Sequence, residues 1–242
     1  MNESKQAIFD AIGARIQEVR SQIENAKSAS PFGQDVTLMA VTKTVDAERI
    51  NYAIDRCGIR CIGENRVQEL CEKYPLLHLD GVSVHLIGTL QSNKVKYIID
   101  KVDMIHSLDS LSLAKEIEKQ AAKHDKIMDC LIEVNVGREE AKGGILPEDT
   151  LPFFASLSAF PHIRVRGLMT IAPNTHDSAQ YMAYFSEVKA LYDTLCKDSA
   201  FCERLGGGAP VLSMGMSGSF SEAIRCGSHI VRIGSGIFGA RG

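Results

Sequence analysis

The sequence predicts an α/β fold, a single TIM-type (β/α)8 barrel with an extra N-terminal helix. Three observations predict this class: eight short apolar runs rich in β-branched residues, a helical pattern after every run but the last, and a chain of 242 residues. Strands that are apolar along their whole length are covered on both faces and are therefore parallel. A closed barrel accommodates eight such units in about 250 residues.

The predicted strands and helices alternate along the chain. After an opening helix at residues 3–28, strands are predicted at 36–41, 59–63, 84–88, 104–108, 130–136, 165–171, 211–216 and 229–234. Asp46 is a typical N-cap for the helix after the first strand, and Gly58 lies just beyond the end of that helix. Later helical patterns lie near 64–73, 92–101, 110–124, 148–159, 177–197 and 219–226.

An open, doubly wound sheet is the alternative fold. A G-x-G-x-x-G turn after an early strand would favour it, but the turn after the first strand reads TKTVDAE and contains no glycine. No repeat, low-complexity tract or linker divides the chain. We therefore expect residues 1–242 to form one barrel domain, on which the helix within residues 1–28 packs.

The charge balance and the N-terminal sequence exclude several classes of protein. With 27 basic and 30 acidic side chains the net charge is −3, so no overall positive field attracts nucleic acid or an anionic membrane. The N-terminus is polar and helix-like, unlike a signal peptide, and no apolar run approaches the roughly 18 residues that span a bilayer. Seven cysteines without a C-x-x-C pair are typical of reduced thiols. We expect a cytoplasmic protein without nucleic-acid or membrane partners.

Polar residues gather where the predicted strands end, which is where the active sites of parallel barrels lie. Lys43 follows the first strand directly, and desolvation at the rim of a core lowers the pKa of a lysine. The resulting free amine is what a Schiff base with a carbonyl compound requires. Alternatively, Lys43 bends outward or pairs with a carboxylate such as Glu64. Asn65, after the second strand, is either a ligand-binding residue or a cap of the following helix.

The last two strands are followed by loops rich in glycine and serine, at 215–224 and 233–239. Such loops let backbone N–H groups approach an anion, and in barrels this pair of loops is the frequent phosphate site. Arg232 lies inside the last strand, where it either faces the barrel mouth or is a paired structural cation. His85 and His106 lie within strands without metal-ligand spacing, so no metal site is predicted.

A Schiff-base lysine, a phosphate-binding loop and a partner for a ring nitrogen are the three contributions that pyridoxal 5′-phosphate (PLP) requires of a protein. Eight motifs carry these residues: LMAVTKT, IGENRVQE, HLIGTLQSNK, IHSLD, EVNVG, RGLMTIAP, LSMGMSGSF and VRIGSGIFGAR. Together they resemble the pyridoxal phosphate homeostasis proteins over essentially the whole chain. The sequence departs from that family's pattern at Gly218-Ser219-Phe220 and at Thr89.

The resemblance implies a barrel similar to the cofactor domain of alanine racemase, with PLP held as a covalent aldimine on Lys43. Arg232 would face the pyridine nitrogen, and Asn65 is a further candidate contact. The resemblance also implies which residues hold the phosphate: Ser213, Ser217, Gly234 and Ser235.

The function implied is intracellular PLP homeostasis, in which the protein stores, buffers or delivers the cofactor, with PLP and apo PLP enzymes as partners. An arginine opposite the ring nitrogen disfavours its protonation and weakens the electron sink that carbanion chemistry needs. The chain also ends shortly after the last strand, without the second domain that supplies racemases with an opposing acid or base. We therefore expect a monomeric carrier without catalytic residues. A PLP-dependent racemase-like enzyme, or a barrel enzyme without PLP such as a Schiff-base aldolase or phosphosugar isomerase, remain alternatives.

Overall fold

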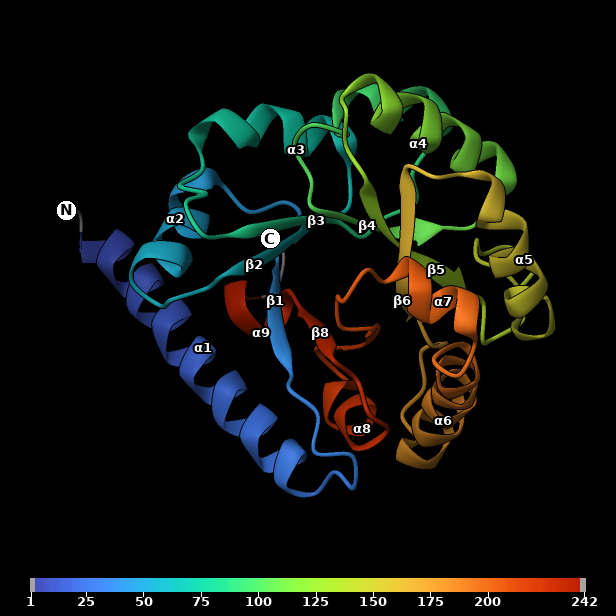
Figure 1. The fold of residues 1–242 in the computed structure, drawn as a ribbon. Coiled ribbons are helices and arrows are strands. Elements are labelled where there is room, and N and C mark those ends of the chain that lie inside the picture. The colour runs from blue at the N-terminus through green and yellow to red at the C-terminus, as the bar shows by residue number, and fades with distance from the viewer. Residues whose placement is uncertain (1–2, 240–242) are drawn as a thin grey trace.

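A closed barrel of eight parallel strands forms the centre of the molecule, and helices surround it (Figure 1). The structure is a computed structural model and describes residues 3–239. Strands pair in chain order, and β8 pairs with β1 to close the barrel. The strands are β1 Thr37–Val41, β2 Cys61–Glu64, β3 Ser83–Leu86, β4 Met104–Leu108, β5 Met128–Val134, β6 Ile163–Thr170, β7 Val211–Met216 and β8 Ile230–Ile233.

The helices follow the strands in the predicted alternation. They are α1 Glu3–Ser28, α2 Ala47–Asp55, α3 Val67–Lys73, α4 Leu111–Lys123, α5 Thr150–Ser156, α6 Ser178–Leu195, α7 Ser199–Arg204, α8 Phe220–Arg225 and α9 Ser235–Phe238. Short 3-10 helices lie at η1 Tyr74–Leu76, η2 Ser92–Tyr97, η3 Pro147–Asp149 and η4 Leu157–Ala159. The long helix α1 packs against α2, α8 and α9 (Figure 1). Among the described helices, none is long and apolar enough to cross a membrane.

The barrel and its eight strands are confirmed, with boundaries shifted by two residues or fewer. The side chain of Asp46 caps α2 by accepting from the Arg49 N–H at 2.9 Å, as predicted. The helix predicted near 92–101 is present only as the shorter 3-10 helix η2 at Ser92–Tyr97. The short helices α7 and α9 were not predicted, since four to six residues display no helical period.

Side chains alternate between the inside and the outside of the barrel along each strand. In β8, Val231 and Ile233 belong to the large core between barrel and helices, whereas Ile230 belongs to a separate cluster inside the barrel. Arg232 therefore points inward, together with Ile230. The inner clusters are formed by Met39, Val41, Cys61, Ile87 and Ile230, and by Met104, Leu131 and Met169.

Candidate functional site

The carboxyl ends of the strands form the barrel mouth, and Lys43 lies there in the turn after β1. The turn runs from Thr42 to Val45, whose N–H donates to the Thr42 carbonyl at 3.0 Å. The Lys43 side chain is half-buried, as expected of a residue at the rim of a core. The structure therefore puts this lysine at the end of the barrel where parallel barrels bind their substrates.

Arg232 is buried inside the barrel, with only 4% of its surface exposed. Its guanidinium donates to the Ser213 hydroxyl and to the Thr170 carbonyl, both at 2.8 Å. Burial lowers the pKa of Arg232 to about 10, and nearby Glu133 opposes that shift. The arginine thus stays charged at neutral pH and is held in place by two neutral oxygens.

Glu133 is a half-buried carboxylate that sequence reasoning missed. It lies in β5 between Ile132 and Val134, which belong to the outer core, so its side chain faces the barrel interior. Burial and the neighbouring Asp109 raise the pKa of Glu133 to about 7, while Arg232 lowers it. The alternation of the run CLIEV was the available signal, because an acidic residue between outward-facing apolar residues must point inward.

The two small-residue loops after β7 and β8 contact each other. The Ser235 hydroxyl lies 3.4 Å from the Ser217 hydroxyl, and the Gly236 N–H donates to Ser217 Oγ at 3.4 Å. Gly234 precedes Ser235 and joins β8 to α9. Ser213 is separate from this group, since its hydroxyl is buried in β7 and accepts from Arg232. The expected phosphate residues thus divide into a loop group and one hydroxyl that orients the arginine.

Asn65 follows β2 at the mouth. Its Oδ1 is buried and has no hydrogen-bond partner among the described residues. A Cβ added at Gly88 would lie 2.3 Å from the Asn65 carbonyl oxygen, so the two loops are in backbone contact. The N-cap residue of α3 is Arg66, which makes no side-chain cap hydrogen bond, so the alternative that Asn65 caps this helix was wrong.

Glu64 is the last residue of β2 and is fully buried. Its Oε1 accepts from the Thr42 hydroxyl at 2.6 Å and from Lys73 Nζ at 3.1 Å, while its Oε2 has no partner in the described part of the chain. Burial raises the pKa of Glu64, and the bonds from Thr42 and Lys73 partly offset this effect. Lys73 of α3, a residue not among the predicted site residues, forms a salt bridge with Glu64.

The interior of the barrel also contains a row of neutral polar side chains. His85 Nδ1 lies 2.9 Å from His106 Nε2, and Cys61 Sγ lies 4.0 Å from His85 Nε2. Burial lowers the pKa of both histidines, to about 4 for His85. Within residues 3–239 no group of His, Cys, Asp and Glu is arranged to hold a metal ion.

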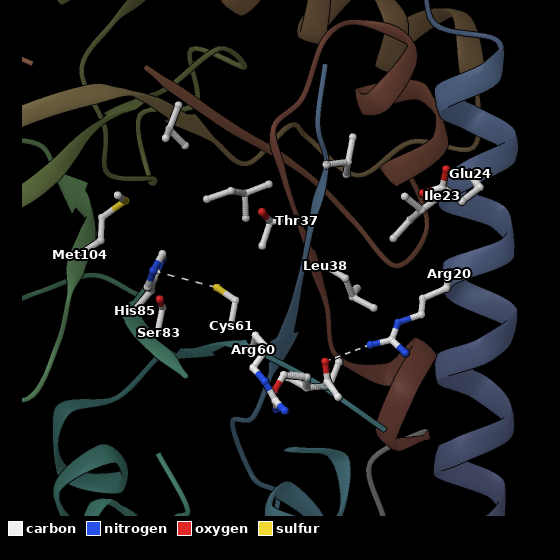
Figure 2. A pocket seen from close by; sticks show the side chains of 15 residues that line it. Arg20, Ile23, Glu24, Thr37, Leu38, Arg60, Cys61, Ser83, His85 and Met104 are labelled. Atoms are coloured by element: carbon white, nitrogen blue, oxygen red, sulfur yellow. Dashed lines mark hydrogen bonds between the residues drawn. The ribbon is translucent and has the colours of Figure 1, made fainter. Parts of the chain in front are cut away.

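A cavity of about 700 Å³ lies at the N-terminal end of the barrel, opposite the mouth. Thr37, Cys61, His85 and Met104, from the first four strands, line this cavity, and Figure 2 shows Arg20 of α1 on the other side of Leu38 from Thr37. The Arg20 guanidinium donates to the Gly58 carbonyl at 3.1 Å. None of the predicted site residues lines this cavity.

The groups at the mouth suit PLP. A phosphate can bind the small-residue loops around Ser217 and Ser235, an aldehyde can react with the Lys43 amine, and a ring nitrogen can accept from Arg232. The buried, unpartnered Oδ1 of Asn65 is a polar atom that a ligand in the mouth can satisfy. The last two residues of the motif VRIGSGIFGAR, Ala240 and Arg241, lie outside the described residues.

Comparisons with known sequences agree with this chemistry. Residues 14–242 match the family model of the alanine racemase N-terminal domain. The chain is 42% identical over 228 residues to the pyridoxal phosphate homeostasis protein of Aquifex aeolicus, a match that covers 94% of this chain and 97% of that protein. It is 35% identical over 243 residues to the pyridoxal phosphate homeostasis protein of Escherichia coli, covering 95% and 97% of the two chains.

Two solved structures show the same barrel. PipY of Synechococcus elongatus, determined with PLP bound, has a TM-score of 0.76 and 30% identity, over 94% of this chain and 100% of that chain. An alanine racemase of Clostridium difficile has a TM-score of 0.66 and 14% identity, over 92% of this chain and 56% of the racemase. At that identity the racemase shows a shared fold alone.

Proposed function

Because the chain belongs to the pyridoxal phosphate homeostasis protein family, we propose that it binds PLP at its barrel mouth and stores, buffers or delivers the cofactor. PLP supplies an electrophilic aldehyde when bound. Lys43 is the amine that would bind that aldehyde covalently, as an imine. The phosphate would bind the loop group of Ser217, Gly234 and Ser235, and Asn65 would contact the ligand from β2.

The observation that carries the proposal is the buried arginine. Arg232 sits inside the barrel, and the two oxygens that orient it at 2.8 Å, from Ser213 and Thr170, are both neutral. A guanidinium has donors only, so it suits an unprotonated ring nitrogen. A ring nitrogen without a proton is a weak electron sink, which favours a carrier over a catalyst. Ser213 then acts through Arg232 and not on the phosphate.

An absorbance spectrum followed by borohydride reduction and peptide mapping tests the binding proposal. The expected result is a visible imine band, in the protein as purified or after PLP is added, with the reduced label on Lys43. Absence of a band after PLP addition would overturn the proposal and favour a phosphate-binding barrel enzyme without PLP. A label confined to another lysine would contradict the assignment of Lys43.

Delivery is tested by mixing the loaded protein with an apo PLP enzyme. Activity of the recipient should return at the rate at which the imine band of the carrier disappears. The matched control is the same protein after borohydride reduction, which cannot release its cofactor and should not activate the recipient. Recovery no faster than release into buffer would leave storage as the function and contradict delivery.

A racemase-like activity is the second candidate function, and Glu133 is the observation that favours it. A carboxyl group whose pKa is raised to about 7 is suited to move a proton near neutral pH. Loaded protein incubated with a panel of amino acids in deuterated water would exchange α-protons if Glu133 served in this way, and Glu133→Gln would abolish the exchange. No exchange with any member of the panel would count against this candidate.

A further inference from the structure

The residue after Lys43 has a backbone conformation that its own side chain disfavours. Thr44 has φ of +62°, in the left-handed region, where β-branched residues are seldom found. It occupies the third position of the Thr42–Val45 turn, which at positive φ is usually glycine. Lys43 occupies the second position, so the direction of its side chain depends on this turn. A strained backbone persists only where the surrounding structure holds it.

Three side chains of the next strand and helix hold this turn. Lys73 Nζ donates to the Thr42 carbonyl at 2.8 Å, and the Glu69 carboxylate accepts from the Thr44 N–H. Glu64 accepts from the Thr42 hydroxyl at 2.6 Å. The Thr42 carbonyl, the Thr44 N–H and the Thr42 hydroxyl are therefore each bound to a side chain of β2 or α3. We call Glu64, Glu69 and Lys73 the turn clamp.

The members of the turn clamp also bind one another. Lys73 Nζ lies 2.5 Å from Glu69 Oε1 and 3.1 Å from Glu64 Oε1. With the Thr42 carbonyl, these acceptors match the three donors of an ammonium group. An ammonium that donates to three acceptors has no lone pair to offer a carbonyl compound. The Lys73 amine, although it is hydrogen-bonded to the turn that carries Lys43, is therefore not available to react with an aldehyde.

We propose that Glu69 and Lys73 are positioning residues for Lys43. They hold Thr44 in the left-handed conformation, which directs the Lys43 amine into the mouth, and the same bonds keep Lys73 from competing for the aldehyde. The statement about the aldehyde rests on the proposed function, whereas the statement about the turn does not. Glycine adopts positive φ without strain, so Thr44→Gly should remove the need for the clamp.

Imine formation in variants tests the positioning role. When PLP is added to the apo-protein, Glu69→Ala should slow the appearance of the imine band about tenfold or more, because a nucleophile displaced by about 1 Å loses up to a hundredfold in rate. Glu69→Gln keeps an acceptor for the Thr44 N–H and should stay near the wild-type rate. Glu72→Ala, at an exposed position of α3, is the matched control and should not change the rate.

Rescue and labelling separate positioning from general damage to α3. Thr44→Gly combined with Glu69→Ala should restore the rate, whereas glycine in the turn cannot repair a destabilised helix. Reduced label in Glu69→Ala should divide between Lys43 and Lys73, since Lys73 loses an acceptor. A wild-type rate in Glu69→Ala, or a failure of Thr44→Gly to restore it, would overturn the proposal.

Melting temperatures without PLP distinguish this proposal from the proposed function. Glu69→Ala should lower the melting temperature more in the presence of Thr44 than in combination with Thr44→Gly. Additive effects would overturn the turn clamp, whatever PLP does. Coupled melting temperatures in a protein that binds no PLP would leave the clamp standing and refute the proposed function.

Discussion

The two ends of the barrel satisfy their polar groups in different ways. At the N-terminal end, charged groups are paired: the Asp129 carboxylate binds Arg164 at 2.5 Å and Arg166 at 2.7 Å. Of the groups that line the cavity there, His85 and Cys61 are neutral near pH 7, because burial lowers the pKa of His85 to about 4 and raises that of Cys61 to about 12. The charged side chains that line it are bound within the protein: Arg20 and Arg60 donate to backbone carbonyls, and Glu24 pairs with Lys27. The polar groups named here thus have their partners within the protein.

At the mouth, several groups are left incomplete. Arg232 donates to two neutral oxygens, and the buried atoms Glu64 Oε2 and Asn65 Oδ1 have no partner within residues 3–239. A buried polar atom without a partner costs about 1–3 kcal/mol, so folding alone does not favour such an arrangement. The difference teaches that the N-terminal end contributes stability, whereas the mouth retains groups suited to a ligand.

Lys43→Ala should have the largest effect, and only on the mouth. Covalent retention of PLP should be lost completely. The free energy of unfolding should change by less than about 1 kcal/mol, because a half-buried side chain in a turn contributes little to the packing of the core. Mass spectrometry after borohydride reduction and urea unfolding measure the two quantities. Lys96→Ala, at an exposed lysine, is the control. A PLP-lysine adduct in Lys43→Ala protein would contradict the assignment.

Asp129→Asn should have the opposite profile. It leaves Arg164 and Arg166 without a charged partner, and the free energy of unfolding should fall by about 2 kcal/mol, less than for a deeply buried pair because Arg164 is partly exposed. The imine band should not change. Asp193→Asn, which breaks the Lys189 pair on α6, is the control and should cost well under 1 kcal/mol. If Asp129→Asn lost the imine band but kept its stability, the N-terminal end would contribute to ligand binding, and the contrast between the two ends would be wrong.

Glu133→Gln should change how the stability of the apo-protein depends on pH. The pKa of Glu133 is raised from 4.5 to about 7 in the folded protein, so the folded state binds the proton more tightly than the unfolded state. Wild-type stability should therefore fall as pH rises from 4.5 to about 7. This loss in the free energy of unfolding is on the order of 2–3 kcal/mol in the wild type, and Glu133→Gln should not show it.

Urea unfolding at several pH values measures this effect. Glu139→Gln, on the loop after β5, is the control, since its carboxylate pairs with Lys142 at the surface. The same pH dependence in Glu133→Gln and in the wild type would contradict the raised pKa of the Glu133 carboxyl group.

Arg20→Ala should have the smallest effect. It removes one hydrogen bond from α1 to the Gly58 carbonyl at the N-terminal cavity, at a cost of about 1 kcal/mol in the free energy of unfolding. PLP binding should be unchanged, because the variant alters the end opposite the mouth. A weaker imine band would indicate that the two ends are coupled through the barrel.

Much of this fold follows from local sequence patterns. The runs around Met39 and Val231 are apolar on both faces, which is enough to predict parallel strands covered by helices. Lys43 and Arg232 were recognisable because a charged residue adjoining or interrupting such a run lies at or inside the barrel. The same alternation is enough to predict that the Glu133 side chain points into the barrel.

Other features were beyond the sequence because they join distant residues. Ser213 resembles a phosphate ligand in its motif, yet its hydroxyl binds Arg232, 19 positions away. Lys73 is 31 positions from Thr42, and its spacing from Glu69 is the ordinary i,i+4 pair of any exposed helix. Nothing local distinguishes such a pair from a solvated one.

By itself, the sequence determined the order of strands and helices, the barrel that they form, and the lysine and arginine at its mouth, because apolar periodicity and chain length limit how parallel strands can be covered. Tertiary structure alone decided which polar atoms meet. The division of the serines, the turn clamp and the contrast between the two ends arise from barrel closure, which brings strand ends from distant parts of the chain within hydrogen-bond distance.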